Sequence, residues 1–178
     1  MQTVHEIIFM NQSEFILLVQ PFKDKVFRLA RRLLISVEEA EDVTQEMLMR
    51  LWHKKENLHQ YKSVEAFAMT MTKNYCLDQL KNKRSFHLKI EKADYSDNSR
   101  LLQDQIEYSD SLNWVEKIIE KLPVQQKLIV QMRDIEQYDF DKIAEILEMN
   151  ETAIRVALSR ARKTIRETML KTHNYGIK

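Results

Sequence analysis

The sequence contains one glycine, Gly176, and two prolines, Pro21 and Pro123, in 178 residues. Average usage would place about 12 glycines in a chain of this length. Phosphate-binding loops, dinucleotide fingerprints and nucleophile elbows need glycine where the backbone turns tightly or approaches a ligand. Strand-rich folds need a Gly- or Asn-type turn about every ten residues. The shortage of glycine excludes these sites and predicts an all-α chain.

Composition narrows the class of protein further. Apolar residues make up 44% of the chain and charged residues 31%, so the chain can bury a core. The single cysteine, Cys76, excludes an intrachain disulfide and fits a reducing cytoplasm. The five histidines lack metal-ligand spacing, and uncharged stretches are shorter than about ten residues, far below the length of a membrane span. We expect a cytoplasmic protein with no metal, no cofactor and no membrane insertion.

Apolar residues at three- and four-residue steps predict helices in the first half of the chain. Pro21 suits the first position of a helix, where a missing N–H costs nothing, so a new helix is expected to begin there. The apolar face on either side of it consists of Phe15, Leu18, Val19, Phe22, Val26, Leu29, Ala30 and Leu33.

Ser36 and Glu39 have the spacing of a capping box that starts the next predicted helix. A polar loop is expected at 56–62, after which Ser63 can cap a long helix that runs to about Lys83. Residues 1–84 are therefore predicted to form a helical domain. The apolar face of the capped helix is Ala40, Val43, Met47, Leu48, Leu51 and Trp52.

Residues 85–111 are predicted to be a flexible acidic linker. They carry three basic and six acidic side chains and show patchy periodicity, with one short helical piece near Leu101–Ile106. Residues 112–178 are predicted to form a second small helical domain, in which Pro123 suits the first position of a helix. Its first apolar face is Leu112, Val115, Ile118, Ile119 and Leu122.

The segment from about Asp139 to Ser159 has the spacing of a helix-turn-helix. A short helix at 140–147 and a three-residue break precede a long helix from about Glu151 to Lys171, with Asn150 as its N-cap. From residue 152 to 171 there are six basic residues and one acidic residue, which matches the phosphate-neutralising footprint of DNA binding. An ordinary solvated helix is the alternative. The expected small core is Ile143, Leu147, Met149, Ile154 and Leu158, with Ala144 where the helices cross.

Two polar sets lie in the first domain. Asp42, Gln45 and Glu46 share adjoining turns of one helix, as an exposed polar face or as a protein-docking surface. Asn74 and Asp78 lie among apolar neighbours, which favours a hydrogen-bonded network, because an unpaired buried carboxylate is costly. Basic residues interleaved with aromatic residues nearby suit single-stranded nucleic acid, although aromatic residues at helical spacing usually belong to a core.

These stretches resemble bacterial RNA polymerase sigma factors. The order Asp42-Val-Thr-Gln-Glu, Leu51-Trp52 and Lys73-Asn-Tyr-Cys-Leu-Asp78 is similar to the first conserved domain of that family. The stretch from Leu122-Pro123 through Ile143-Ala-Glu-Ile-Leu147 to Ala153–Arg162 is similar to its promoter-binding last domain. With these two domains and no others, the chain resembles the extracytoplasmic-function (ECF) class. Glu148 stands in the turn where the family usually has glycine, and a left-handed residue there costs roughly 1 kcal/mol.

The resemblance implies a protein without a catalytic site, which binds core RNA polymerase and directs initiation by recognising and melting promoter DNA. It implies core polymerase binding by Asp42, Gln45, Glu46, Arg50, Leu51 and Trp52. It implies binding of the −10 element by Asn57, His59, Tyr61, Lys62, Asn74, Asp78, Lys81 and Arg84. It implies binding of the −35 element by Thr152, Arg155, Val156, Ser159, Arg160, Arg162 and Lys163. An anti-sigma factor is a further implied partner. A free-standing helix-turn-helix regulator is the alternative, which binding to core polymerase would distinguish.

Overall fold

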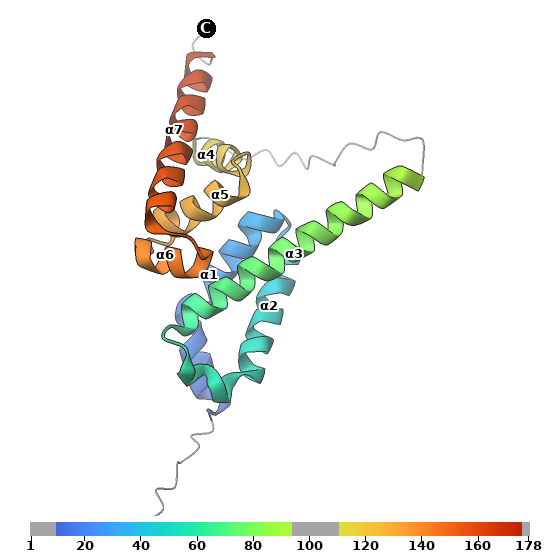
Figure 1. Ribbon diagram of the computed structural model, residues 1–178, viewed down its shortest axis with the longest axis vertical. Helices are drawn as coiled ribbons and strands as arrows, with labels where there is room; N and C mark the ends of the chain where they lie inside the picture. The colour runs from blue at the N-terminus through green and yellow to red at the C-terminus, as the bar shows by residue number, and fades with distance from the viewer. Residues whose placement is uncertain (1–9, 94–110, 176–178) are drawn as a thin grey trace, which may run out of the picture. The chain divides into compact units, whose positions relative to one another are not determined.

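The computed structural model describes the backbone of residues 10–93 and 111–175, and the side chains of residues 10–83 and 114–171. All regular structure in these ranges is helical, with no strand, as predicted. The helices form two compact units, one mainly from α1, α2, η1 and the first part of α3, the other mainly from α4 to α7 (Figure 1). None of the described helices is long and apolar enough to cross a membrane.

The first unit begins with α1 (Gln12–Leu34) and α2 (Val37–His53), which pack against each other (Figure 1). The Ser36 hydroxyl accepts the Glu39 N–H at the start of α2, as predicted. It also donates to Glu38, whose pKa is lowered first by a backbone hydrogen bond and then by this hydroxyl. A complete capping box of Asn11 and Glu14 starts α1, which the sequence analysis did not identify.

The prediction that a helix begins at Pro21 is wrong, because α1 continues through it. An interior proline removes one main-chain hydrogen bond and costs about 3 kcal/mol. Burial compensates, since Phe15 and Val19 before the proline and Phe22 and Val26 after it are all buried on one helix face. The packing of a continuous apolar face therefore outweighs the local helix-breaking tendency.

The rest of the first unit consists of η1 (Lys55–Gln60), a 3-10 helix, and α3 (Val64–Ala93). The polar segment predicted as a loop forms η1 because Leu58 is buried within it. Ser63 caps α3 as predicted, by accepting the Ala66 N–H at 3.1 Å. The ion pair of Lys25 with Glu65, at 2.8 Å, links α1 to α3.

The predicted end of the third helix near Lys83 is wrong, because α3 extends to Ala93. Residues 85–93 contain no glycine or proline that would end a helix, so the helix overlaps the start of the predicted linker. The helical piece predicted near Leu101–Ile106 lies outside the described residues, and the linker itself stays a prediction.

The second unit contains α4 (Ser111–Glu120), α5 (Val124–Val130), the π-helical turn η2 (Gln131–Ile135), α6 (Phe140–Leu147) and α7 (Glu151–Tyr175). Pro123 is the N-cap of α5, whereas it was predicted to be the first residue of the helix. Both α4 and α5 pack against α7 (Figure 1). The core of this unit includes Ile118, Ile119, Leu122, Leu128, Ile129, Met132, Ile143, Ile154, Leu158 and Ala161.

Candidate nucleic-acid and protein interfaces

The structure confirms the helix-turn-helix geometry of α6 and α7. Glu148 ends α6 in the left-handed conformation, with φ 55° and ψ 43°. The Asn150 side chain then accepts the Ala153 N–H at 2.7 Å and caps α7. Ile143 of α6 is buried with Ile154 and Leu158 of α7, so the two helices share one small core.

All seven α7 residues expected at the −35 element are exposed, namely Thr152, Arg155, Val156, Ser159, Arg160, Arg162 and Lys163. Their charges are partly neutralised by acidic neighbours. Arg155 pairs with Glu151 at 3.0 Å, and Lys163 pairs with Glu167 at 3.7 Å. Arg160 forms no ion pair with any side chain that the structure describes, so its guanidinium is available to a ligand.

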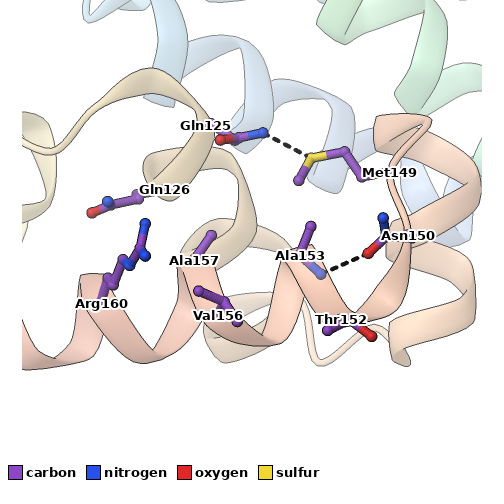
Figure 2. A pocket seen from close by; sticks show the side chains of 9 residues that line it. All are labelled: Gln125, Gln126, Met149, Asn150, Thr152, Ala153, Val156, Ala157 and Arg160. Atoms are coloured by element: carbon purple, nitrogen blue, oxygen red, sulfur yellow. Dashed lines mark hydrogen bonds between the residues drawn. The ribbon is translucent and has the colours of Figure 1, made fainter.

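A surface hollow of about 420 Å³ lies between α5 and the first half of α7. Figure 2 shows Arg160 of α7 reaching towards Gln126 of α5 across it. Gln125 lies beside it and donates a hydrogen bond to the Met149 sulfur at 3.0 Å. The full lining is Gln125, Gln126, Met149, Asn150, Thr152, Ala153, Val156, Ala157 and Arg160.

The two glutamines of this hollow were not identified from the sequence. They stand between the apolar positions Leu122 and Leu128, and this is the only signal that could have marked them as surface residues. The position of Gln126 opposite Arg160 depends on how α5 packs against α7, which no local pattern encodes. The hollow therefore combines amide and guanidinium groups, the donors and acceptors that read base edges and phosphates.

The predicted docking face of α2 divides into exposed and buried parts. Asp42 and Gln45 are exposed. Glu46 accepts a hydrogen bond from Arg50 at 2.6 Å, and the Arg50 guanidinium lies 4.8 Å from the centre of the Tyr75 ring of α3. The Glu46–Arg50 part of this face is therefore held by contacts within the unit.

Leu51 and Trp52, unlike most of the other residues expected to bind core polymerase, are not exposed. Leu51 is fully buried, so its side chain supports the core and is not open to a partner. The Trp52 ring packs edge-on against Phe15, with ring centres 5.1 Å apart. The Lys55 ammonium lies 3.8 Å from the centre of the same ring. Trp52 is consequently half-buried and joins α2 to both α1 and η1.

The residues expected at the −10 element lie along η1 and α3. Asn57, His59, Tyr61 and Lys62 are exposed. The Tyr61 ring stacks on Phe67 of α3, with centres 3.8 Å apart and planes 19° apart. Tyr61 is exposed and Phe67 is partly buried, and this aromatic pair is the feature of the first unit that best suits an unstacked base.

The expected buried network around Asn74 and Asp78 is wrong. Both side chains are exposed, and Asp78 pairs with Lys81 at 3.3 Å on its own helix. Because water solvates an exposed carboxylate, no interior partner is needed. The Arg84 side chain lies outside the described residues. Within the part of the chain that is described, no three His, Cys, Asp or Glu side chains are grouped to hold a metal ion.

Comparison with known proteins places this architecture in a family. Residues 18–86 match the model of sigma-70 region 2, and residues 112–165 match that of sigma-70 region 4. The ECF RNA polymerase sigma factor SigW of Bacillus subtilis is 24% identical over 169 residues, which cover 89% of this chain and 90% of SigW. The ECF sigma factor SigE of Mycolicibacterium smegmatis is 26% identical, and the match covers 86% of this chain and 61% of SigE.

A solved structure shows the same fold. The sigma factor RpoE of Bartonella quintana, in complex with the anti-sigma factor NepR, superposes with a TM-score of 0.70 at 20% identity, covering 88% of this chain and 97% of RpoE. The two matched regions together account for both helical units and for the helix-turn-helix. The chain therefore belongs to the ECF-type RNA polymerase sigma factors, with sigma-70 regions 2 and 4.

Proposed function

We propose that the two regions have separate binding roles in promoter-specific initiation. Residues 1–84 bind core polymerase through α2 and the −10 element through η1 and α3. Residues 112–178 bind the −35 element through α7, and residues 85–111 connect them. The protein acts in the cytoplasm, where polymerase and promoter DNA are found.

The observation that carries this proposal is the α7 surface beside the hollow. Arg160 is exposed and without an ionic partner among the described side chains, and Gln126 lies opposite it. An arginine can donate two hydrogen bonds to a guanine edge, and a glutamine can pair with an adenine edge. We therefore assign Arg160, Thr152 and Ser159 to base edges or phosphates in the major groove, with Gln125 and Gln126 beside them.

The stacked pair Tyr61 and Phe67 supports the assignment of η1 and α3 to melted DNA. Base–aromatic stacking contributes about 1–3 kcal/mol per base and needs an open ring face. Tyr61 is exposed at the end of η1, and Lys62 next to it supplies a positive charge for the backbone. The exposed Lys81 further along α3 extends this basic surface.

Core polymerase is assigned to the exposed part of α2, namely Asp42 and Gln45, together with the Glu46–Arg50 pair. Leu51 and Trp52 support that surface from inside the unit. Because the RpoE structure holds an anti-sigma factor, we also propose that a protein of this kind restrains the present chain by covering its polymerase-binding surfaces.

Reconstituted transcription tests the proposal. Purified chain and core polymerase are given a pool of templates randomised in both promoter elements, and run-off transcripts are sequenced. We expect transcripts from templates that share two short elements, and none from core polymerase alone. Specific binding to duplex DNA without polymerase, combined with no association with the core enzyme, would instead identify a free-standing regulator.

A further inference from the structure

Phe140 occupies an unusual electrostatic position in the second unit. It is the first residue of α6, and two guanidinium groups lie over its ring. The Arg155 guanidinium carbon, from α7, is 3.8 Å from the ring centre, and that of Arg133, from η2, is 4.7 Å away. A ring face attracts cations at these distances. One aromatic side chain therefore connects three elements around the helix-turn-helix.

Arg133, one of the two arginines over the ring, is itself held in place by hydrogen bonds. Arg133 donates a hydrogen bond to the Tyr138 carbonyl at 2.6 Å and approaches the Asp139 carboxylate at 3.4 Å. The two acceptors belong to the two residues before Phe140, so Arg133 restrains the segment from which the ring projects. The position of the Phe140 ring is therefore restrained, and a second side chain can pack against it in a defined orientation.

Arg155 is the side chain positioned there, and a second contact restrains it. Its Nη2 donates to the Glu151 carboxylate at 3.0 Å, one turn earlier on α7. Even so, 57% of the Arg155 side chain is exposed. An arginine has five N–H donors. Contact with the ring uses the face of the guanidinium and Glu151 uses one nitrogen, so further in-plane donors remain available to a ligand.

We propose that Phe140 is a positioning residue that holds Arg155 in the orientation required to contact a base edge of the upstream promoter element. The inference rests on the proposed function of α7. Its physical basis is preorganisation, because a side chain that is already restrained loses less conformational freedom on binding. Phe140 thereby influences base preference at a position that it does not itself touch.

The test compares Phe140→Leu, Phe140→Tyr, Arg155→Ala and the double variant F140L/R155A in the full chain with core polymerase. Templates carry every base at each position of the upstream element obtained from the wild-type selection, and relative initiation is measured. We expect R155A to relax preference at one position. We expect F140L to reduce preference at that same position by about two- to fivefold, the range of an exposed cation–π contact. F140Y keeps the ring and should retain the preference.

The double variant separates positioning from general stability. If Phe140 acts through Arg155, adding F140L to R155A changes nothing further. A matched control is Glu167→Gln, which removes the other i,i+4 ion pair within α7 and should leave the preference at the Arg155 position unchanged. Urea unfolding of each variant measures stability independently of DNA.

Three results would overturn the inference. F140L could reduce initiation equally at all templates, its effect could persist in the R155A background, or R155A could leave every preference unchanged. If one of these results is obtained while the wild-type chain still directs initiation, the inference fails and the proposed function stands. A wild-type chain that fails to direct initiation from any template removes the proposed function, and the inference with it.

Discussion

The Arg162 guanidinium of α7 donates two hydrogen bonds to the Asp134 carboxylate of η2, one of them from Nε to Oδ2 at 3.2 Å. The hydrogen bond to Asp134 raises the pKa of Arg162 above its ordinary value. The pair joins the long helix to the π-helical turn, 28 residues earlier in the chain. The charge of Arg162 is thus already compensated within the protein, unlike that of Arg160.

From this pair we predict a structural role for Arg162. Asp134→Asn should lower the free energy of unfolding by about 0.5–1 kcal/mol, because exposed ion pairs are weak even with good geometry. Urea unfolding of the full chain measures this. Arg162→Ala should cause a similar loss and should leave the salt dependence of promoter binding unchanged. A decrease of about one in the log–log salt slope of R162A would instead show a phosphate contact.

Arg160 is predicted to read DNA directly. Arg160→Ala should cost about 1–3 kcal/mol of promoter affinity and relax preference at one base position, if the guanidinium contacts a base edge. The matched control is Arg166→Ala, an exposed arginine further along α7, which should leave base preference unchanged. Binding of each variant, as holoenzyme, to single-base promoter variants provides the measurement. Equal effects of the two substitutions would remove the assignment.

Patterns that depend on neighbouring residues were predictable. Apolar spacing identified the buried faces of α1 and α2, because a helix repeats its surface every three or four residues. Ser36, Ser63 and Asn150 were identified as caps for the same reason, since the side-chain oxygen of a cap accepts from the backbone N–H three residues later. The left-handed turn at Glu148 was implied by the family resemblance and not by a local pattern, and Glu148 does have a positive φ of 55°.

Features that depend on tertiary packing were not predictable. Pro21 is a helix breaker by its local chemistry, and only the burial of residues on both sides of it explains why α1 continues. The contact of Phe140 with Arg155 and the pair of Arg162 with Asp134 join residues far apart in sequence. Their partners follow from how the helices cross, so the basic residues of α7 look alike in the sequence and differ in the structure.

Charge reversal on α2 should separate polymerase binding from folding. Asp42→Lys is expected to weaken association with core polymerase about five- to tenfold, the effect of losing one significant interface residue. Because Asp42 is exposed, helix content by circular dichroism should be unchanged. Glu41→Lys is the matched control, since it makes the same charge change at the adjacent exposed position. If both variants bind core polymerase like the wild type, the docking surface lies elsewhere.

Cys76 is predicted to be unreactive in the folded protein. Burial raises the pKa of its thiol from 9.0 to about 12, and the negative charge of Glu39 contributes. Above pH 9 the thiol loses its proton in the unfolded chain but keeps it in the folded protein. The contribution of the buried neutral thiol to the free energy of unfolding is therefore fully present below pH 9 and is lost as the pH rises towards 12. The slope is at most about 1.4 kcal/mol per pH unit.

A thiol reagent at pH 8 checks this prediction. Because the thiolate is the nucleophile, labelling should be slow in the native protein and rapid in urea. Cys76→Ala should show a smaller loss of stability between pH 9 and pH 11 than the wild type. Immediate labelling of the native chain would show that α3 opens locally around the thiol.

Glu148→Gly is expected to stabilise the second unit. A non-glycine residue in the left-handed region costs roughly 1–2 kcal/mol, and Glu148 has φ 55° and ψ 43° there. Glycine removes that cost but loses about 0.5–1 kcal/mol more conformational entropy on folding. The net gain in the free energy of unfolding should therefore be between about 0 and 1.5 kcal/mol, with a central value of about 0.8 kcal/mol. Urea unfolding of the full chain, followed by circular dichroism, measures it.

The same substitution three residues earlier provides the control. Glu145 is exposed within α6, where the backbone is right-handed and glycine has no steric advantage. Glu145→Gly should therefore destabilise by about 1 kcal/mol, as expected for glycine inside a helix. Opposite signs for the two variants would attribute the effect to the backbone conformation at the turn. If E148G is destabilised as much as E145G, the contacts of the Glu148 side chain outweigh its backbone strain.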